Sequence, residues 1–253
     1  MTQIFADLSN LQDGMLAIGG EDYNHIKNVL RMHPGEKLTV RGTDQSSDEY
    51  VFEIVSFSDG LVNCRQLSVK QSETELPARV ILFQGLPKSD KMDFIVQKTV
   101  EMGVTEIVPV EMHRSIVKLA GDKRRKRAAR WQAIAESAAK QSKRAVIPQV
   151  REIMAFREAL QYASSCADHV LVPYEAMADT AGNGTRALLE SLEPGRTVAV
   201  FVGPEGGFEG TEIEEALESG AKTVSLGRRI LRTETAGMCL LSVLMFQLDG
   251  MDQ

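Results

Sequence analysis

Residues 197–210 read TVAVFVGPEGGFEG, a run of small and β-branched apolar residues that breaks into a glycine-rich turn. A short apolar run bounded by turn residues is typical of a buried strand. Glycine lets a backbone approach a ligand closely, and ligands in open α/β sheets bind beyond the carboxyl ends of strands. The stretch therefore predicts a buried strand, followed at residues 203–207 by either a tight turn or a ligand-binding loop.

The chain around this stretch alternates between strand-like and helix-like segments from residue 79 onward. The strand-like segments are RVILFQG, TEIVPVEM, HVLVPY, TVAVFV and KTVSLG, and the helical ones include DKMDFIVQKTVEM and the apolar TETAGMCLLSVLMFQL. Such alternation is typical of an α/β domain with a mainly parallel sheet. We expect this domain to span residues 73–253.

The first 72 residues have a different pattern. Short alternating segments, KLTVRG, YVFEIVSF and LVNCRQLSV, are separated by turn residues, and one helical stretch, YNHIKNVL, precedes them. This pattern predicts a small β-rich module over residues 1–72. The polar passage KQSETELPA, at residues 70–78, contains the expected boundary.

Composition excludes several classes of protein. No run of about 18 apolar residues is present, so we expect no membrane span. The first residues lack the basic region and the apolar stretch of a secretory signal. The three cysteines are far apart and the chain has only four histidines, so neither a disulfide framework nor a metal site is expected. We therefore expect a cytoplasmic protein.

Positive charge is concentrated in one segment although the net charge is −6. Residues 123–144 hold nine Lys or Arg and one Glu, a local +8, which leaves −14 for the rest of the chain. The segment is either a solvated helix face or a contact for nucleic-acid phosphates. The candidate phosphate contacts are Lys123, Arg124, Arg125, Arg127, Arg130, Lys143 and Arg144.

A second loop, GRRILR at residues 227–232, follows the next strand-like segment. Two glycine loops after successive strands favour a binding site over two unrelated turns. A phosphate-binding loop would end in Lys-Ser or Lys-Thr, whereas Phe208 and Glu209 stand there, and Glu205 would repel a pyrophosphate. A neutral or cationic ligand suits this loop better, and S-adenosylmethionine, with its sulfonium charge, meets that description.

The motifs GPEGGF and LGRRILRTETA, about twenty residues apart, closely resemble those of the RsmE family of methyltransferases. The segments HIKNVLRM, IVQKTVEMGVTEIVPV and AAKQSKRAVIPQV are similar to further segments of that family. The resemblance implies a PUA-like β-barrel for RNA, followed by a trefoil-knotted α/β domain of the SPOUT superfamily. It also implies methylation of N3 of a uridine in 16S ribosomal RNA, with S-adenosylmethionine as cofactor.

Partners follow from the same resemblance. The expected substrate is 16S ribosomal RNA within the small ribosomal subunit, and SPOUT enzymes generally work as homodimers with the knot at the subunit interface. The apolar segment MCLLSVLMFQL, at residues 238–248, either supplies such a surface or belongs to an ordinary core.

The resemblance also suggests roles for single residues. Arg232 would stabilise the uracil anion through a charge-assisted hydrogen bond, and either Glu205 or Glu234 would accept the N3 proton. His25, Lys27 and Arg31 would contact RNA. The expected cofactor contacts are Val172, Pro173, Tyr174, Gly203, Glu205, Gly206, Gly207, Leu226, Gly227, Ile230 and Leu231.

Two other functions compete with methyl transfer. One is a non-catalytic RNA-binding or ribosome-assembly protein that keeps a SPOUT-like core, and the intact RILRTETA stretch and both glycine loops argue against it. The other is a nicotinamide-dependent oxidoreductase, which the missing dinucleotide fingerprint disfavours.

Overall fold

The computed structural model describes residues 2–44, 46–117, 119–174 and 184–248. The chain forms two compact units, one of residues 1–75 with 139–147, the other of residues 76–138 with 148–253. Residues 139–147 join the first unit although they follow a segment of the second. The domain boundary that the sequence predicts between residues 72 and 73 stays a prediction.

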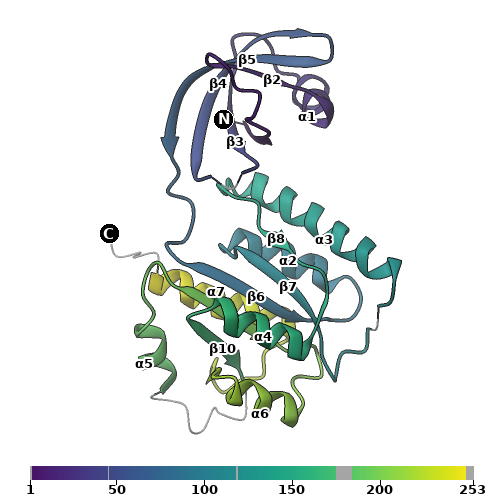
Figure 1. Ribbon diagram of the computed structural model, residues 1–253, viewed down its shortest axis with the longest axis vertical. Helices are drawn as coiled ribbons and strands as arrows, with labels where there is room; N and C mark the ends of the chain where they lie inside the picture. Colours follow the sequence, from purple (N-terminus) through teal and green to yellow (C-terminus); the bar gives the residue numbers. More distant parts are fainter. Residues whose placement is uncertain (1, 45, 118, 175–183, 249–253) are drawn as a thin grey trace. The chain divides into compact units, whose positions relative to one another are not determined.

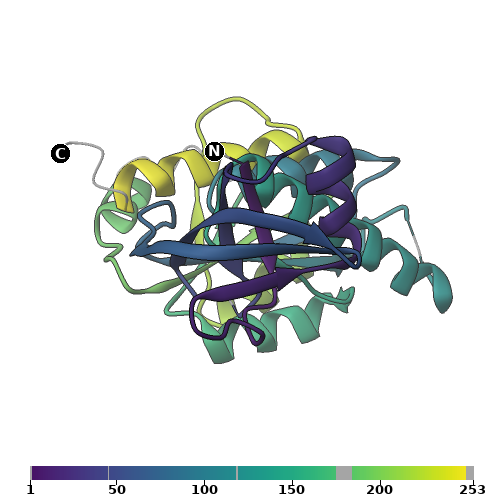
Figure 2. The same cartoon turned by 90° about the horizontal axis from the view of Figure 1, so that it is seen from above.

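The first unit is built on a five-stranded sheet with the strand order β1-β3-β4-β5-β2, and its strands lie side by side in purple to blue in Figure 2. Strands β1 and β3 are parallel, and the other pairs are antiparallel. The chain order is β1 (Thr2–Ala6), β2 (Met15–Ile18), helix α1 (Gly20–Asn24), the π-helix η1 (His25–Val29), β3 (Lys37–Gly42), β4 (Asp48–Ser58) and β5 (Leu61–Gln71).

One apolar cluster fills this unit. Alternate residues of β3, β4 and β5 point into it, as the two-residue period of a strand requires, and Ile26 of η1 packs against them. Its most deeply buried members are Leu38, Val40, Phe52, Val62, Cys64 and Ile26.

The second unit contains a seven-stranded sheet with the order β12-β10-β11-β6-β7-β8, in which β9 also pairs with β7. Every pairing in it is parallel. Its strands are β6 (Arg79–Gly85), β7 (Glu106–Glu111), β8 (Gln149–Val150), β9 (Met154–Ala155), β10 (His169–Pro173), β11 (Thr197–Val202) and β12 (Lys222–Val224). The expected parallel α/β domain is confirmed.

Helices cover both faces of this sheet, as Figure 1 shows. On one face, Ile81 and Phe83 of β6 lie in one cluster with Phe156 of α4 and Ile213 of α6. On the other face, α7 packs against α2 and approaches Leu82. The helices of this unit are α2 (Lys91–Glu101), α3 (Asp122–Gln141), α4 (Phe156–Cys166), α5 (Gly184–Glu190), α6 (Gly210–Glu218) and α7 (Thr233–Leu248).

Candidate functional site

A pocket of about 740 Å³ opens at the carboxyl ends of β10 and β11. This volume lies within the range of small-molecule sites, and the position is the one expected for a ligand in an α/β sheet. Its walls come from both glycine loops and from the first turns of α2 and α7. The lining residues are Lys91, Arg114, Pro173, Tyr174, 202–210, Ile230, Leu231, Arg232, Thr233 and Ala236.

The loop at residues 203–207 brings bare backbone to the pocket. Gly207 has a φ of +68°, which favours glycine, and a Cβ there would point into open space. A Cβ on Gly206 would lie 3.0 Å from the Cβ of Arg114. Arg114 donates hydrogen bonds to the Gly206 carbonyl at 3.1 Å and to the Glu209 carboxylate at 2.7 Å. The side chain of Arg114 therefore holds the loop in place. The sequence motifs did not indicate Arg114, which follows the end of strand β7.

Thr233 joins the second loop to the first. Its hydroxyl donates to the carbonyl of Gly203 at 2.6 Å and accepts from the Gln84 amide at 2.8 Å. Because Thr233 is 5% exposed, these bonds are shielded from water. The segment that carries Arg232 is thus fixed at the end of β11.

The structure brings together eight of the eleven expected cofactor contacts. Pro173, Tyr174, Ile230 and Leu231 line the pocket, as do all four residues expected from the first loop. Among the described residues, the lining does not include Val172, Leu226 or Gly227. Val172 lies in the core beneath the pocket, so a direct contact from its side chain is not supported.

The two carboxylates proposed as proton acceptors lie on either side of Lys91. The Lys91 Nζ is 3.0 Å from Glu205 Oε1 and 3.4 Å from Glu234 Oε2. The Glu205 carboxylate also accepts hydrogen bonds from the Lys88 backbone N–H at 3.1 and 3.3 Å. Burial alone would raise the pKa of Glu205, but the bonds from Lys91 and from backbone N–H groups outweigh burial and lower it. Glu205 is therefore held as an anion.

Arg232 lies on the wall of the same pocket and is exposed. Within the described residues its guanidinium makes no hydrogen bond or ion pair, and only its backbone carbonyl is engaged, by the N–H groups of Thr235 and Ala236. Because its guanidinium has no partner among the described residues, Arg232 is available to bind an anion.

The donor set fits a methyl donor such as S-adenosylmethionine. Within the trio of Lys91, Glu205 and Glu234, two carboxylates face one ammonium, and this local excess of negative charge would attract a sulfonium. Among the described residues the pocket lining includes Glu205 but not Glu234, and Arg232 supplies a separate positive charge on the wall. The open space beside Gly207 admits a ligand against the backbone.

The predicted RNA contacts of the first unit are exposed. His25 and Lys27 lie on η1, and Arg31 follows it with a φ of +53°. The ammonium of Lys27 is 5.1 Å from the ring centre of Tyr23 and 2.7 Å from its hydroxyl. A cation beside an aromatic ring offers both charge and a stacking surface to an unpaired base.

The basic run lies on α3, where several of its charges are already paired. Arg124 donates to Glu111 and to the Ile153 carbonyl, and Arg130 donates to Asp93. Lys123, Arg125 and Lys126 are exposed. Arg127 is 3.8 Å from Asp90, and Arg125 pairs with Asp122 one turn away.

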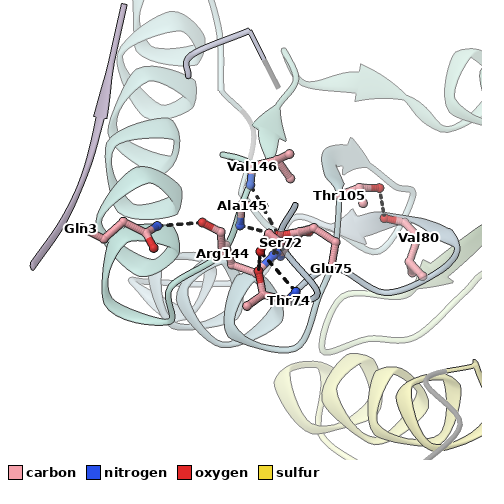
Figure 3. Close-up of polar contacts among 9 residues, drawn as sticks. All are labelled: Gln3, Ser72, Thr74, Glu75, Val80, Thr105, Arg144, Ala145 and Val146. Carbon is pink, nitrogen blue, oxygen red and sulfur yellow. Dashed lines mark hydrogen bonds and ion pairs between the residues drawn. The ribbon is translucent and has the colours of Figure 1, made fainter. Parts of the chain in front are cut away.

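The prediction that Arg144 contacts phosphates is corrected by the structure, in which its side chain is buried. Its side chain is only 3% exposed, and its guanidinium donates hydrogen bonds to the Glu75 carboxylate at 2.9 and 3.0 Å. Figure 3 shows the same carboxylate accepting from the backbone N–H groups of Ala145 and Val146, and Gln3 donating to the Arg144 carbonyl. Arg144 fixes the fold of the first unit, whereas the neighbouring Lys143 is exposed.

Metal sites and membrane spans are absent from residues 2–44, 46–117, 119–174 and 184–248. No group of three or more His, Cys, Asp or Glu side chains there could hold a metal ion. No helix in these ranges is long and apolar enough to cross a bilayer.

Comparison with known proteins adds family information. Residues 74–245 match a family of RNA methyltransferase domains, and residues 18–65 match a family of RNA methyltransferase PUA domains. The Ribosomal RNA small subunit methyltransferase E of Bacillus subtilis is 36% identical over 92% of this chain and 90% of its own length. That of Mesomycoplasma hyopneumoniae is 32% identical over 91% and 94%. The crystal structure of the Neisseria gonorrhoeae protein of that name, bound to S-adenosyl methionine, has a TM-score of 0.81, 31% identity and 98% coverage of both chains.

Proposed function

The chain belongs to the family of small-subunit ribosomal RNA methyltransferases E, and from this premise we propose that it methylates N3 of a uridine in 16S ribosomal RNA. It is an S-adenosylmethionine-dependent ribosomal RNA methyltransferase with an N-terminal PUA domain and a C-terminal SPOUT domain. The observation that carries the proposal is the pocket in which the glycine loop with Glu205 faces Arg232, whose guanidinium has no partner among the described residues.

Methyl transfer requires the acceptor nitrogen to lie in line with the bond that breaks. The cofactor, when bound, supplies an electrophilic methyl group. The wall formed by residues 203–207, Ile230 and Leu231 would hold that cofactor, and Arg232, on the wall of the same pocket, would bind the base. The Thr233–Gly203 hydrogen bond keeps the two parts of the wall in register.

The uridine N3 loses its proton as it forms the bond to carbon, and negative charge develops on the uracil carbonyls. Arg232 stabilises this charge through a charge-assisted hydrogen bond. Glu205 is a weak proton acceptor because Lys91 and backbone N–H groups already stabilise its anion. Glu234 is the other candidate acceptor, and its Oε2 lies 3.4 Å from the Lys91 ammonium.

The RNA is held by exposed basic side chains in each unit. His25, Lys27 and Arg31 contact RNA from the PUA domain, and Lys123, Arg125 and the remaining exposed basic residues of α3 neutralise phosphates. Such contacts position the RNA without reading its sequence, so the shape of the assembled small subunit selects the target. The protein therefore acts in the cytoplasm on that particle.

A homodimer completes the proposal. On α7, Val243 and Phe246 are exposed (37% and 62%) although the opposite side of the helix is buried. An apolar helix face of this kind suits a contact with a second copy of the chain. Sedimentation velocity of the wild type and of Phe246→Lys tests this, and a monomeric wild type would contradict it.

The decisive experiment is transfer of a tritiated methyl group to small subunits from a strain that lacks its own enzyme of this family. Labelled 3-methyluridine in the nucleoside digest is expected, with Arg232→Ala as the negative control. Free 16S ribosomal RNA, assayed in parallel, reports whether the assembled particle is needed. Label at another nucleoside would overturn the target assignment.

A non-catalytic RNA-binding protein is the outcome if no transfer occurs. Calorimetry with S-adenosylmethionine separates the two functions, because a decayed site binds no cofactor even at millimolar concentration. Binding together with transfer supports the enzyme.

A further inference from the structure

Lys91 lies where three parts of the pocket meet. It is the first residue of α2, and its ammonium reaches Glu205 of the glycine loop at 3.0 Å and Glu234 of α7 at 3.4 Å. The three side chains are between 18% and 31% exposed. None of the sequence motifs singled out Lys91.

The three charges support one another. The pKa of Lys91 is raised, first by its hydrogen bond to Glu205 and further by both carboxylates, against the opposing effect of burial. Two carboxylates near one another would repel each other without a cation between them. The ammonium, in contact with both, offsets this repulsion.

The contacts of Lys91 also join two segments of the site. Glu205 belongs to the loop at residues 203–207, and Glu234 stands next to Thr233 in the first turn of α7. Lys91 thus connects these two segments a second time, through side-chain contacts with both carboxylates, in addition to the Thr233–Gly203 hydrogen bond.

We propose that Lys91 is a positioning residue for methyl transfer, which bridges Glu205 and Glu234 and so fixes the glycine loop against α7. This inference rests on the proposed function. Lys91 acts through the two carboxylates and does not touch the reacting atoms. The bridge also explains why a lysine is tolerated beside a cationic ligand: the group keeps one net negative charge.

The test is a double-mutant cycle on Lys91 and Glu205. Lys91→Met, Glu205→Gln and the double variant are compared by kcat and KM for small subunits and by the Kd for S-adenosylhomocysteine, measured by calorimetry. We expect Lys91→Met to lower kcat about tenfold to a hundredfold with little change in KM for the subunit. The double variant should be no worse than the worse single variant, because coupled residues give non-additive effects.

Two further variants make the result specific. Lys91→Arg keeps the charge and should restore at least a third of kcat, whereas a merely space-filling role would be met equally by methionine. Lys98→Gln removes a different lysine of α2, which pairs with Glu101 on the same helix, and should behave like the wild type.

The proposal is overturned if the losses at Lys91 and Glu205 multiply, if Lys91→Met retains wild-type kcat, or if Lys98→Gln is equally impaired. Failure of the proposed function has a different signature: the wild type makes no 3-methyluridine, yet non-additivity persists in the Kd for S-adenosylhomocysteine. Far-ultraviolet circular dichroism confirms that each variant is folded.

Discussion

The hydroxyl of Thr233 donates a 2.6 Å hydrogen bond to the carbonyl oxygen of Gly203 and thereby ties the start of α7 to the glycine loop. The two residues are 30 positions apart in the sequence; Thr233 directly follows Arg232, and Gly203 lies two residues before Glu205. The Thr233 hydroxyl also accepts a buried hydrogen bond from Gln84, at the end of β6. One hydroxyl therefore holds three segments of the site in register.

Thr233→Val keeps the shape of the side chain and removes both hydrogen bonds. A lost buried hydrogen bond costs about 1–3 kcal/mol, so the Kd for S-adenosylhomocysteine should rise about tenfold, which corresponds to ~1.4 kcal/mol. Thr233→Ser retains the hydroxyl and should stay within about threefold of the wild type. Calorimetry measures all three proteins, and equal affinities for Val and Ser would contradict the role of the hydroxyl.

Arg232→Ala should abolish turnover while the cofactor still binds. Removal of one group that stabilises a developing anion costs about a hundredfold to a thousandfold in kcat. Single-turnover methylation and calorimetry with S-adenosylmethionine separate the two effects. Arg228→Ala, at an exposed residue of the same loop outside the pocket lining, is the matched control. A collapse of cofactor affinity in Arg232→Ala would mean that Arg232 binds the cofactor instead.

Neutralisation of the exposed basic residues of α3 should weaken RNA binding and its salt dependence. Each phosphate contact contributes about 0.7–0.9 to the slope of log K against log salt. Joint replacement of Lys123, Arg125 and Lys126 by Gln should therefore reduce that slope by about 2–3. Filter binding at several salt concentrations measures it. The control replaces three exposed basic residues of other elements by Gln: Arg157, Arg186 and Lys222. An equal reduction of the slope in this control would contradict a specific RNA-binding face on α3.

Arg144→Met should destabilise the fold instead of acting on RNA directly. Removal of one partner of a buried ion pair leaves Glu75 without its cation and costs about 3 kcal/mol, the lower end of the usual range because Glu75 is 19% exposed. Urea unfolding followed by circular dichroism measures this. Lys143→Gln, at the exposed neighbour, should leave the unfolding free energy unchanged, and similar stabilities for the two variants would refute the structural role of Arg144.

Glu106 should make stability depend on pH. Burial alone would raise its pKa, but hydrogen bonds from Arg151, Tyr162 and Arg79 lower it below the ordinary value of 4.5. A carboxylate with a lowered pKa stabilises the fold fully above its ordinary value, and this contribution disappears as pH falls through the folded-state pKa. The stability difference between wild type and Glu106→Gln should thus be largest near neutral pH and shrink below pH 4.5. Glu218→Gln, at an exposed residue of α6, is the control.

Local patterns in the sequence predicted the elements that carry the site. The expected strands at residues 79–85 and 197–202 and the final helix at 233–248 match β6, β11 and α7 residue for residue. Glycine loops after strands located the pocket. The trefoil knot stays a prediction of the family resemblance. Strands β1, β2, β8 and β9 and helices α4 and α5 were not predicted.

The sequence by itself therefore determined the longer strands of the second unit, the glycine loops and the family, because these depend on residue period and on motifs of neighbouring residues. Only the tertiary structure decided that Arg144 is buried on Glu75, and that Arg114 and Lys91 reach the pocket. The placements of Arg114 and Lys91, which follow β7 and β6, depend on the order of strands in the sheet, which sets β6 between β11 and β7. Strand order depends on contacts between distant segments, and no local pattern of charge or hydrophobicity encodes which carboxylate a given lysine or arginine will meet.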